Sequence, residues 1–154
     1  AVAGQNLGIL RQNPAFLDRR IKSAIYLSPP VTGMAKKNPE QAYGSIKIPG
    51  MLMTGTEDYS PIGSTSIEER RIPFDAIKAP HQYLINFIGA DHAAFGGRSY
   101  RAPKNTDAGF HEMIELMTLK FLNATLYGDE NSWDWLDKGA AADYLAKKAE
   151  YQHK

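Results

Sequence analysis

The chain has 154 residues, of which 43% are hydrophobic and 23% are charged, a composition typical of one soluble globular domain and not of a disordered or fibrous protein. Its 18 basic and 17 acidic residues give a formal net charge of +1, which argues against nucleic acid or an anionic membrane as a partner. The absence of cysteine excludes disulfides, thiolate metal sites and cysteine nucleophiles, and no apolar run approaches the ~20 residues that a membrane-spanning helix needs.

The first residues, 1–6, are small or apolar and carry no helix-capping side chain ahead of them. Three interpretations remain open: a mature protein after removal of a targeting signal, a boundary introduced in cloning, and the continuation of a helix that begins earlier. A signal ahead of Ala1 would not be visible in this sequence, so the compartment is not predicted.

Three short apolar segments, residues 21–28, 46–55 and 81–88, predict β-strands. Residues 51–54 are almost all apolar, as expected of a parallel strand that is covered on both faces. Because helix-sized segments separate the strands, the pattern predicts an α/β fold with a mostly parallel sheet and helices on both faces. Three strands cannot complete such a sheet, since its edges would be left open.

The segments before and between these strands predict two helices and one loop. The pair Asn13 and Pro14 is typical of the start of a short helix. Residues 31–45 have no hydrophobic period and are interpreted as a surface excursion. Residues 64–77 begin with a possible cap at Ser66 and carry acidic residues before apolar ones at helical spacing, which predicts a helix despite an internal proline.

Two helices are predicted after the last strand. Asp107 can cap the first of them, over residues 107–127, and Gly128 follows its end. Its apolar side chains recur at steps of three and four residues and form one stripe: Phe110, Met113, Ile114, Met117 and Phe121. A short turn capped by Ser132 comes next, and residues 140–151 predict a terminal amphipathic helix.

Two candidate catalytic residues, Asp58 and His92, follow consecutive predicted strands. Their separation of 34 positions leaves room for one helix and one strand, so a right-handed crossover would bring both loops to the same end of the sheet. Either residue alone is more often a turn former or a structural group. As a pair, a carboxylate at one imidazole nitrogen leaves the other nitrogen as a general base near neutral pH.

These two loops carry a family resemblance. The first loop follows a strand and has the pattern Gly-Thr-x-Asp; after a helix and a further strand, the second has the pattern Gly-x-Asp-His-x-x-Phe-x-Gly. This order resembles the carboxyl-terminal half of an α/β-hydrolase, in particular the dienelactone hydrolase-like esterases. The resemblance implies Asp58 as the acid and His92 as the base, with Glu57 and Asp91 as alternatives for the acid. It also implies that residues 1–154 form the carboxyl-terminal portion of one α/β-hydrolase domain without an internal boundary.

The nucleophile turn of that family, Gly-x-Ser-x-Gly, does not occur here, because no serine has glycine two residues away on both sides. The resemblance therefore implies that the serine lies upstream and that residues 1–4 end the helix that follows it. The chain would supply the acid and the histidine of a serine hydrolase that cleaves carboxylic esters, without a metal or an organic cofactor. Its expected partners are a small-molecule ester and the missing amino-terminal half of the same gene product.

Other interpretations stay open beside this one. A non-catalytic α/β domain would bind a partner through loops such as residues 31–45. His111 and Glu115 lie one helical turn apart, but the second histidine of a zinc-protease helix is absent, so a solvated helix face is expected there. His81 is expected to open a strand, and His153 to lie in a frayed tail.

Overall fold

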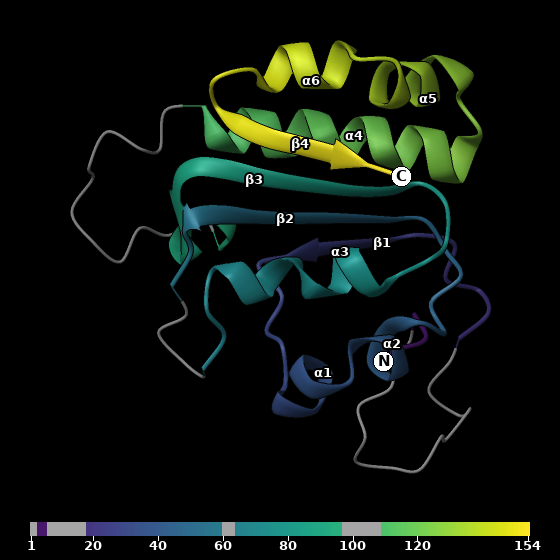
Figure 1. Ribbon diagram of the computed structural model, residues 1–154. Coiled ribbons are helices and arrows are strands. Elements are labelled where there is room, and N and C mark those ends of the chain that lie inside the picture. The colour runs from purple at the N-terminus through teal and green to yellow at the C-terminus, as the bar shows by residue number, and fades with distance from the viewer. Residues whose placement is uncertain (1–2, 6–17, 60–63, 97–108) are drawn as a thin grey trace.

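The computed structural model describes residues 3–5, 18–59, 64–96 and 109–154. These residues build one four-stranded sheet with the strand order β1-β2-β3-β4 (Figure 1). The strands are β1 (Ala24–Leu27), β2 (Gly50–Glu57), β3 (Gln82–Asp91) and β4 (Ala149–His153). The first three are parallel and β4 pairs antiparallel with β3, so the prediction of an α/β fold on a mostly parallel sheet is confirmed.

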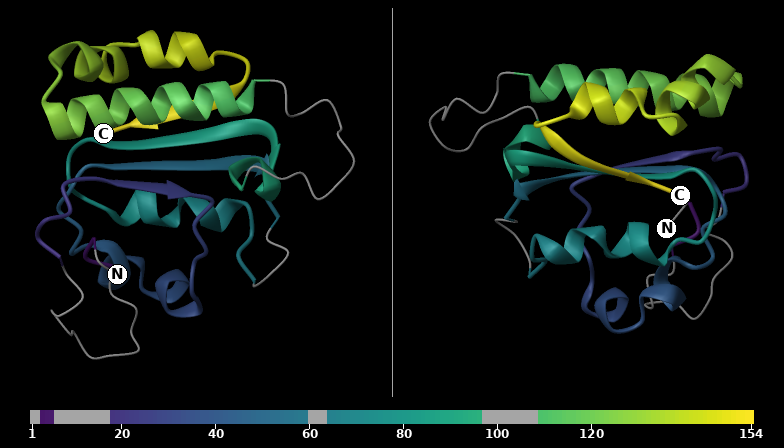
Figure 2. Two further views of the ribbon diagram at one scale, coloured as in Figure 1. Left: turned by 180° about the vertical axis from the view of Figure 1, so that it is seen from behind. Right: turned by 45° about the horizontal axis from the view of Figure 1, so that its top comes forward.

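Helices cover both faces of the sheet (Figures 1 and 2). One face carries α4 (Phe110–Tyr127), α5 (Glu130–Asp137) and α6 (Ala140–Leu145). The other carries α1 (Gly33–Lys37), α2 (Pro39–Tyr43) and α3 (Ile72–Ala76). There are also two 3-10 turns: η2 (Glu68–Arg71) lies directly before α3, and η3 (His92–Phe95) lies directly after β3.

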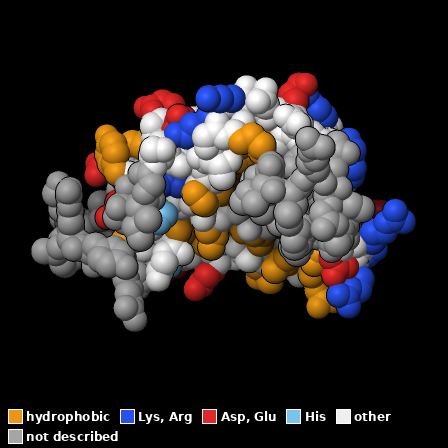
Figure 3. All heavy atoms as spheres, turned by 90° about the horizontal axis from the view of Figure 1, so that it is seen from below, with side chains coloured by type: hydrophobic (Ala, Val, Ile, Leu, Met, Phe, Trp, Pro, Cys, Tyr) orange, Lys and Arg blue, Asp and Glu red, His pale blue; other side chains and the backbone are white. Residues whose placement is uncertain are grey.

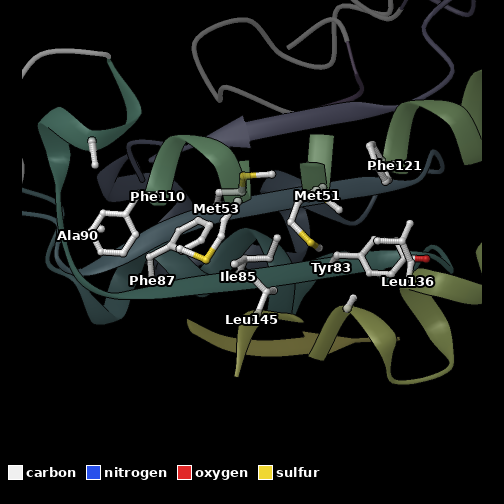
Figure 4. Close-up of a cluster of buried hydrophobic side chains, with 14 of the residues drawn as sticks. Met51, Met53, Tyr83, Ile85, Phe87, Ala90, Phe110, Phe121, Leu136 and Leu145 are labelled. Atoms are coloured by element: carbon white, nitrogen blue, oxygen red, sulfur yellow. The ribbon is translucent and has the colours of Figure 1, made fainter. Parts of the chain in front are cut away.

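Both faces of β2 are buried, which explains its almost continuous apolar sequence. Met51 and Met53 pack in the same cluster as α4, whereas Leu52 between them packs with Phe74 of α3 in another cluster. Figure 4 shows the first cluster, where side chains of β2 and β3 lie beside those of α4. Four residues of the predicted stripe of α4 are buried: Phe110, Met113, Met117 and Phe121. The fifth, Ile114, is partly buried.

Truncating Phe121 to alanine is expected to lower the free energy of unfolding by about 3–5 kcal/mol. The ring is fully buried in the α4 cluster and meets Tyr83 edge to face at a centroid distance of 5.9 Å, so truncation leaves a cavity. Urea denaturation measures the change. Leu119→Ala on the same helix is the matched control, because Leu119 is 55% exposed, and it should change stability by less than about 1 kcal/mol. Equal losses in the two variants would contradict this packing.

The prediction of a surface excursion over residues 31–45 is wrong. This segment contains α1 and α2, and it buries Ala35, Ala42 and Tyr43 in a cluster with Ala76 and Ile77 at the end of α3. Each helix has five residues, which is less than two turns, so no apolar period can develop along the sequence. The segment that carried the binding-domain interpretation is therefore a pair of packed helices.

The predicted terminal helix, residues 140–151, is also wrong in its second half. Helix α6 ends at Leu145, and Lys147 adopts a positive φ of 67° that reverses the chain into β4. Tyr151 and His153 therefore pair with β3, and the tail is not frayed. The strand covers an edge of β3 whose backbone groups would otherwise need water as a partner, and this tertiary gain outweighs the local helix pattern.

Two helix starts differ in detail from the prediction. Asp129, not Ser132, caps α5, because its side chain accepts from the Ser132 backbone N–H at 3.2 Å. Ser66 does cap, since its hydroxyl accepts from the Glu69 N–H while the Glu69 carboxylate accepts from the Ser66 N–H at 2.7 Å. The helix expected over residues 64–77 is divided into η2 and α3.

Some predicted features lie outside the described residues or close to their ends. Asp107 and the helix expected at Asn13 and Pro14 fall outside the described residues, as do residues 1–2 of the expected helix end. Residues 3–5 form a turn in which Gly4 has a φ of 107°. Gly128 ends α4 in the left-handed region, as predicted. Among the helices that are described, none is both long and apolar enough to cross a membrane.

Candidate active site

The predicted acid and base lie side by side where β2 and β3 end. The two strands are adjacent and parallel, and the register places Glu57 opposite Asp91 at their carboxyl ends. Asp58 directly follows β2, and His92 opens η3 directly after β3. His92 Nδ1 lies 2.9 Å from Asp58 Oδ1. The crossover inferred from the sequence therefore brings these two side chains into contact.

A close approach of the two strands precedes this contact. A Cβ atom on Gly55 would lie 2.1 Å from the Ala90 carbonyl oxygen, a distance that no side chain tolerates. The pairing register shifts between Gly55 and Glu57, at the same place. Glycine at position 55 therefore allows β2 and β3 to meet closely just before Asp58 and His92.

Neither alternative acid is at the imidazole. Asp91 caps η3, because its side chain accepts from the backbone N–H groups of Ala93 at 2.9 Å and Ala94 at 3.1 Å. Glu57 is exposed. In the described part of the chain, the carboxylate paired with His92 is that of Asp58. Asp91 instead orients the turn on which the histidine sits.

The Asp58 side chain is completely buried, and besides His92 its carboxylate contacts two hydroxyl donors and one guanidinium. Ser28, at the end of β1, donates its hydroxyl to Oδ1 at 2.9 Å. Thr54 of β2 donates to Oδ2 at 2.9 Å, and Nη2 of Arg70 lies 3.2 Å from Oδ1. A buried carboxylate needs such partners, because an unpaired charge away from water is costly.

These contacts determine which ring nitrogen of His92 carries the proton. An ionised carboxylate only accepts hydrogen bonds, so Nδ1 must donate toward Asp58. The Ser28 hydroxyl already donates to Asp58 and can accept from the same Nδ1–H, from which it lies 2.7 Å away. Within the described residues, the hydrogen bonds of this ring are both at Nδ1, and the side chain is 38% exposed. Nε2 is therefore the nitrogen that can act as a base.

Ser28 is a site residue that the sequence reasoning missed. It is 4% exposed and has a positive φ of 46°, a strained backbone conformation of the kind found at functional sites. It does not have the position of a nucleophile, because it shares Nδ1 with Asp58 and does not approach Nε2. Its place at the end of the first predicted strand, beside the ends of the other two, was the signal that could have identified it.

Arg70 is the second site residue that was missed. Its side chain is 1% exposed, although the run of two glutamates and two arginines around it reads as a solvated surface. Burial lowers the pKa of this guanidinium from its ordinary value, and the attraction of Asp58 partly offsets that effect. The position of Arg70 could not be distinguished from that of Arg71, which is exposed and pairs with Asp75.

The other histidines and carboxylates considered from the sequence are not part of this site. His111 and Glu115 are exposed on α4, and His111 Nε2 lies 3.1 Å from the Ala94 carbonyl oxygen. Within the described ranges, no group of three His, Asp or Glu side chains is arranged to hold a metal ion. On the face drawn in Figure 3, basic and acidic side chains are interspersed and no single charge sign dominates its described residues.

Comparison with known protein families and with curated proteins gives no match for this chain. The function is therefore argued from the geometry of Asp58 and His92.

Proposed function

We propose that this chain is part of a serine hydrolase that cleaves carboxylic esters through an acyl-enzyme, and that it supplies the acid Asp58 and the base His92. The observation that carries this proposal is the contact of a fully buried carboxylate with Nδ1 of a partly exposed imidazole. This arrangement orients the ring, fixes its tautomer and leaves Nε2 on the side from which a substrate can approach.

In the proposed reaction, His92 Nε2 takes the proton of a serine hydroxyl as that oxygen attacks the ester carbonyl. The imidazolium then gives the proton to the departing alcohol, and in the second half-reaction it activates water in the same way. Asp58 stays ionised and stabilises the imidazolium while it exists. Ser28 and Thr54 hold the carboxylate in place by donating to its two oxygens.

The order of elements supports the α/β-hydrolase fold and the dienelactone hydrolase-like subgroup as the finer architecture. An acid after one parallel strand, a helix, the next strand and a histidine after it is the order of that fold. Helix α4 then packs on the sheet, as the last helix of such a domain does.

The nucleophile in this proposal comes from a segment of the same gene product outside these 154 residues. No serine of the chain has the Gly-x-Ser-x-Gly pattern, and Ser28 contacts the wrong ring nitrogen. In addition, the outer edge of β1 pairs with no strand among the described residues, and Leu27 is 44% exposed there. Parallel edges of this kind are usually covered, and a further strand of the same sheet is the covering segment proposed here.

An active-site label tests this proposal. The intact gene product that contains this sequence should hydrolyse p-nitrophenyl acetate and react stoichiometrically with a fluorophosphonate at one serine in a Gly-x-Ser-x-Gly turn. The 154-residue chain alone should remain unlabelled and should not exceed free imidazole in rate. Labelling of any serine within the 154 residues, or an intact protein that neither reacts nor hydrolyses, would show that the proposal is wrong.

A further inference from the structure

We propose that Arg70 is a positioning residue for the proposed site: its buried guanidinium is the permanent counterion of Asp58 and allows His92 to be neutral, and so basic, at neutral pH. This inference rests on the proposed function for its importance, but the state of His92 can be measured without any activity.

The Arg70 side chain ties together the ends of two neighbouring strands. Nε donates to the Asp58 backbone carbonyl at 2.9 Å. Nη1 donates to the carbonyls of Ser28 at 3.0 Å and Pro29 at 3.2 Å, both of which follow β1. Two of these hydrogen bonds therefore go to the backbone of Asp58 and Ser28, and the third goes to the residue after Ser28.

The remaining terminal nitrogen faces the carboxylate. Nη2 of Arg70 is buried and has no hydrogen-bond partner among the described residues, yet it lies 3.2 Å from Asp58 Oδ1. Its contact with the carboxylate is therefore one of charge and not of hydrogen-bond geometry. An arginine that served only to brace the loops would not need to place its charge beside this carboxylate.

The charged groups around Asp58 and His92 leave Arg70 as the counterion of Asp58. Among the described residues, the ion pairs of Asp58 are with Arg70 and His92. Of the other charges of η2 and α3, Glu69 pairs with Lys36 at 2.6 Å and Arg71 with Asp75 at 2.9 Å. Glu68 accepts from the Ser66 hydroxyl at 2.7 Å. The neighbouring carboxylates, at the ends of β2 and β3, are the exposed Glu57 and the capping Asp91, and both are unchanged in the variants that test this inference.

The charge balance explains why a counterion is needed. A general base must be neutral before the reaction, and at that stage the buried carboxylate beside it has no positive charge from the imidazole. Without another cation, the carboxylate would attract a proton onto His92 and keep the ring in its charged form. An arginine satisfies the requirement because its guanidinium stays protonated throughout the working pH range.

Nitrogen-15 NMR of the intact protein tests the inference directly, because ring ¹⁵N shifts report both the tautomer and the protonation of His92. In Arg70→Gln, the midpoint at which His92 loses its proton should move up by about one pH unit or more. Arg70→Lys keeps the positive charge, so its midpoint should lie close to that of the unaltered protein. Arg71→Gln, which removes the adjacent exposed arginine, should leave the midpoint where it is in the unaltered protein.

A second background shows whether Arg70 acts through Asp58. In Asp58→Asn, the carboxylate charge is gone, and adding Arg70→Gln should then shift the midpoint by much less than it does in the unaltered background. An equal shift in both backgrounds, or no shift in a folded Arg70→Gln protein, would overturn the inference.

Folding itself is informative if Arg70→Gln does not fold. The proposal then requires that the double variant Asp58→Asn/Arg70→Gln regains folding, because it no longer buries an uncompensated carboxylate. A double variant that also stays unfolded would overturn the inference. An intact protein without esterase activity would refute the proposed function alone, since the ¹⁵N titrations would still decide the role of Arg70.

Discussion

Replacing His92 with alanine in the intact protein is expected to lower kcat for p-nitrophenyl acetate by several orders of magnitude, leaving only the ~10³–10⁴-fold catalysis over water that binding and the oxyanion hole supply. In the proposed reaction, the imidazole removes the proton from the nucleophile and returns it to the leaving alcohol, and no other described base contacts Asp58. Steady-state kinetics at saturating substrate measures the loss. KM should change little, because the proposed role of the ring is in the transition state and not in substrate binding.

His153→Ala is the control for this substitution. His153 pairs with Tyr83 at the amino-terminal end of β3, which is the opposite end of the sheet from His92. Its removal should leave kcat close to that of the unaltered protein. If His153→Ala lost as much activity as His92→Ala, the loss would reflect damage to the fold and the assignment of His92 as the base would fail.

Replacing Asp58 with asparagine is expected to lower kcat to a similar extent, about 10⁴-fold, although the two side chains have nearly the same shape. An amide can present its N–H₂ group to His92 Nδ1, which favours the tautomer with the proton on Nε2 and so blocks the base. The variant also leaves the buried Arg70 guanidinium without its carboxylate, so its folding should be checked by circular dichroism before kinetics.

Two neighbouring carboxylates provide matched controls for Asp58→Asn. Glu57→Gln alters an exposed side chain and should have little effect on kcat. Asp91→Asn should have a mild effect, because asparagine retains the capping of η3 that the Asp91 side chain performs. A larger loss in Glu57→Gln than in Asp58→Asn would show that the acid has been assigned to the wrong residue.

The contact between Asp58 and His92 could be predicted from the sequence because it depends on chain order and strand direction alone. Two apolar segments separated by one helix-sized stretch form adjacent parallel strands, and their carboxyl ends then lie together. Helix α4 was predictable for a comparable reason, since its 18 residues are long enough to show the period of a buried stripe. The prediction of α4 uses a pattern within one continuous segment, and the prediction of the Asp58–His92 contact uses only the order of a few segments along the chain.

The features that were missed depend on partners far away in the chain. Residues 149–151 were predicted as the end of a helix, and they belong to β4 because an open edge of β3 is available to pair with them. Ser28 and Arg70 are ordinary polar residues in their local sequences, and they acquire their roles only where β1, β2 and η2 converge on Asp58. The sequence by itself determined the parallel strands and the contact between Asp58 and His92 that follow them. Only the tertiary structure decided which buried donors and which cation satisfy that pair, because burial and hydrogen bonding are properties of converging segments and not of any one of them.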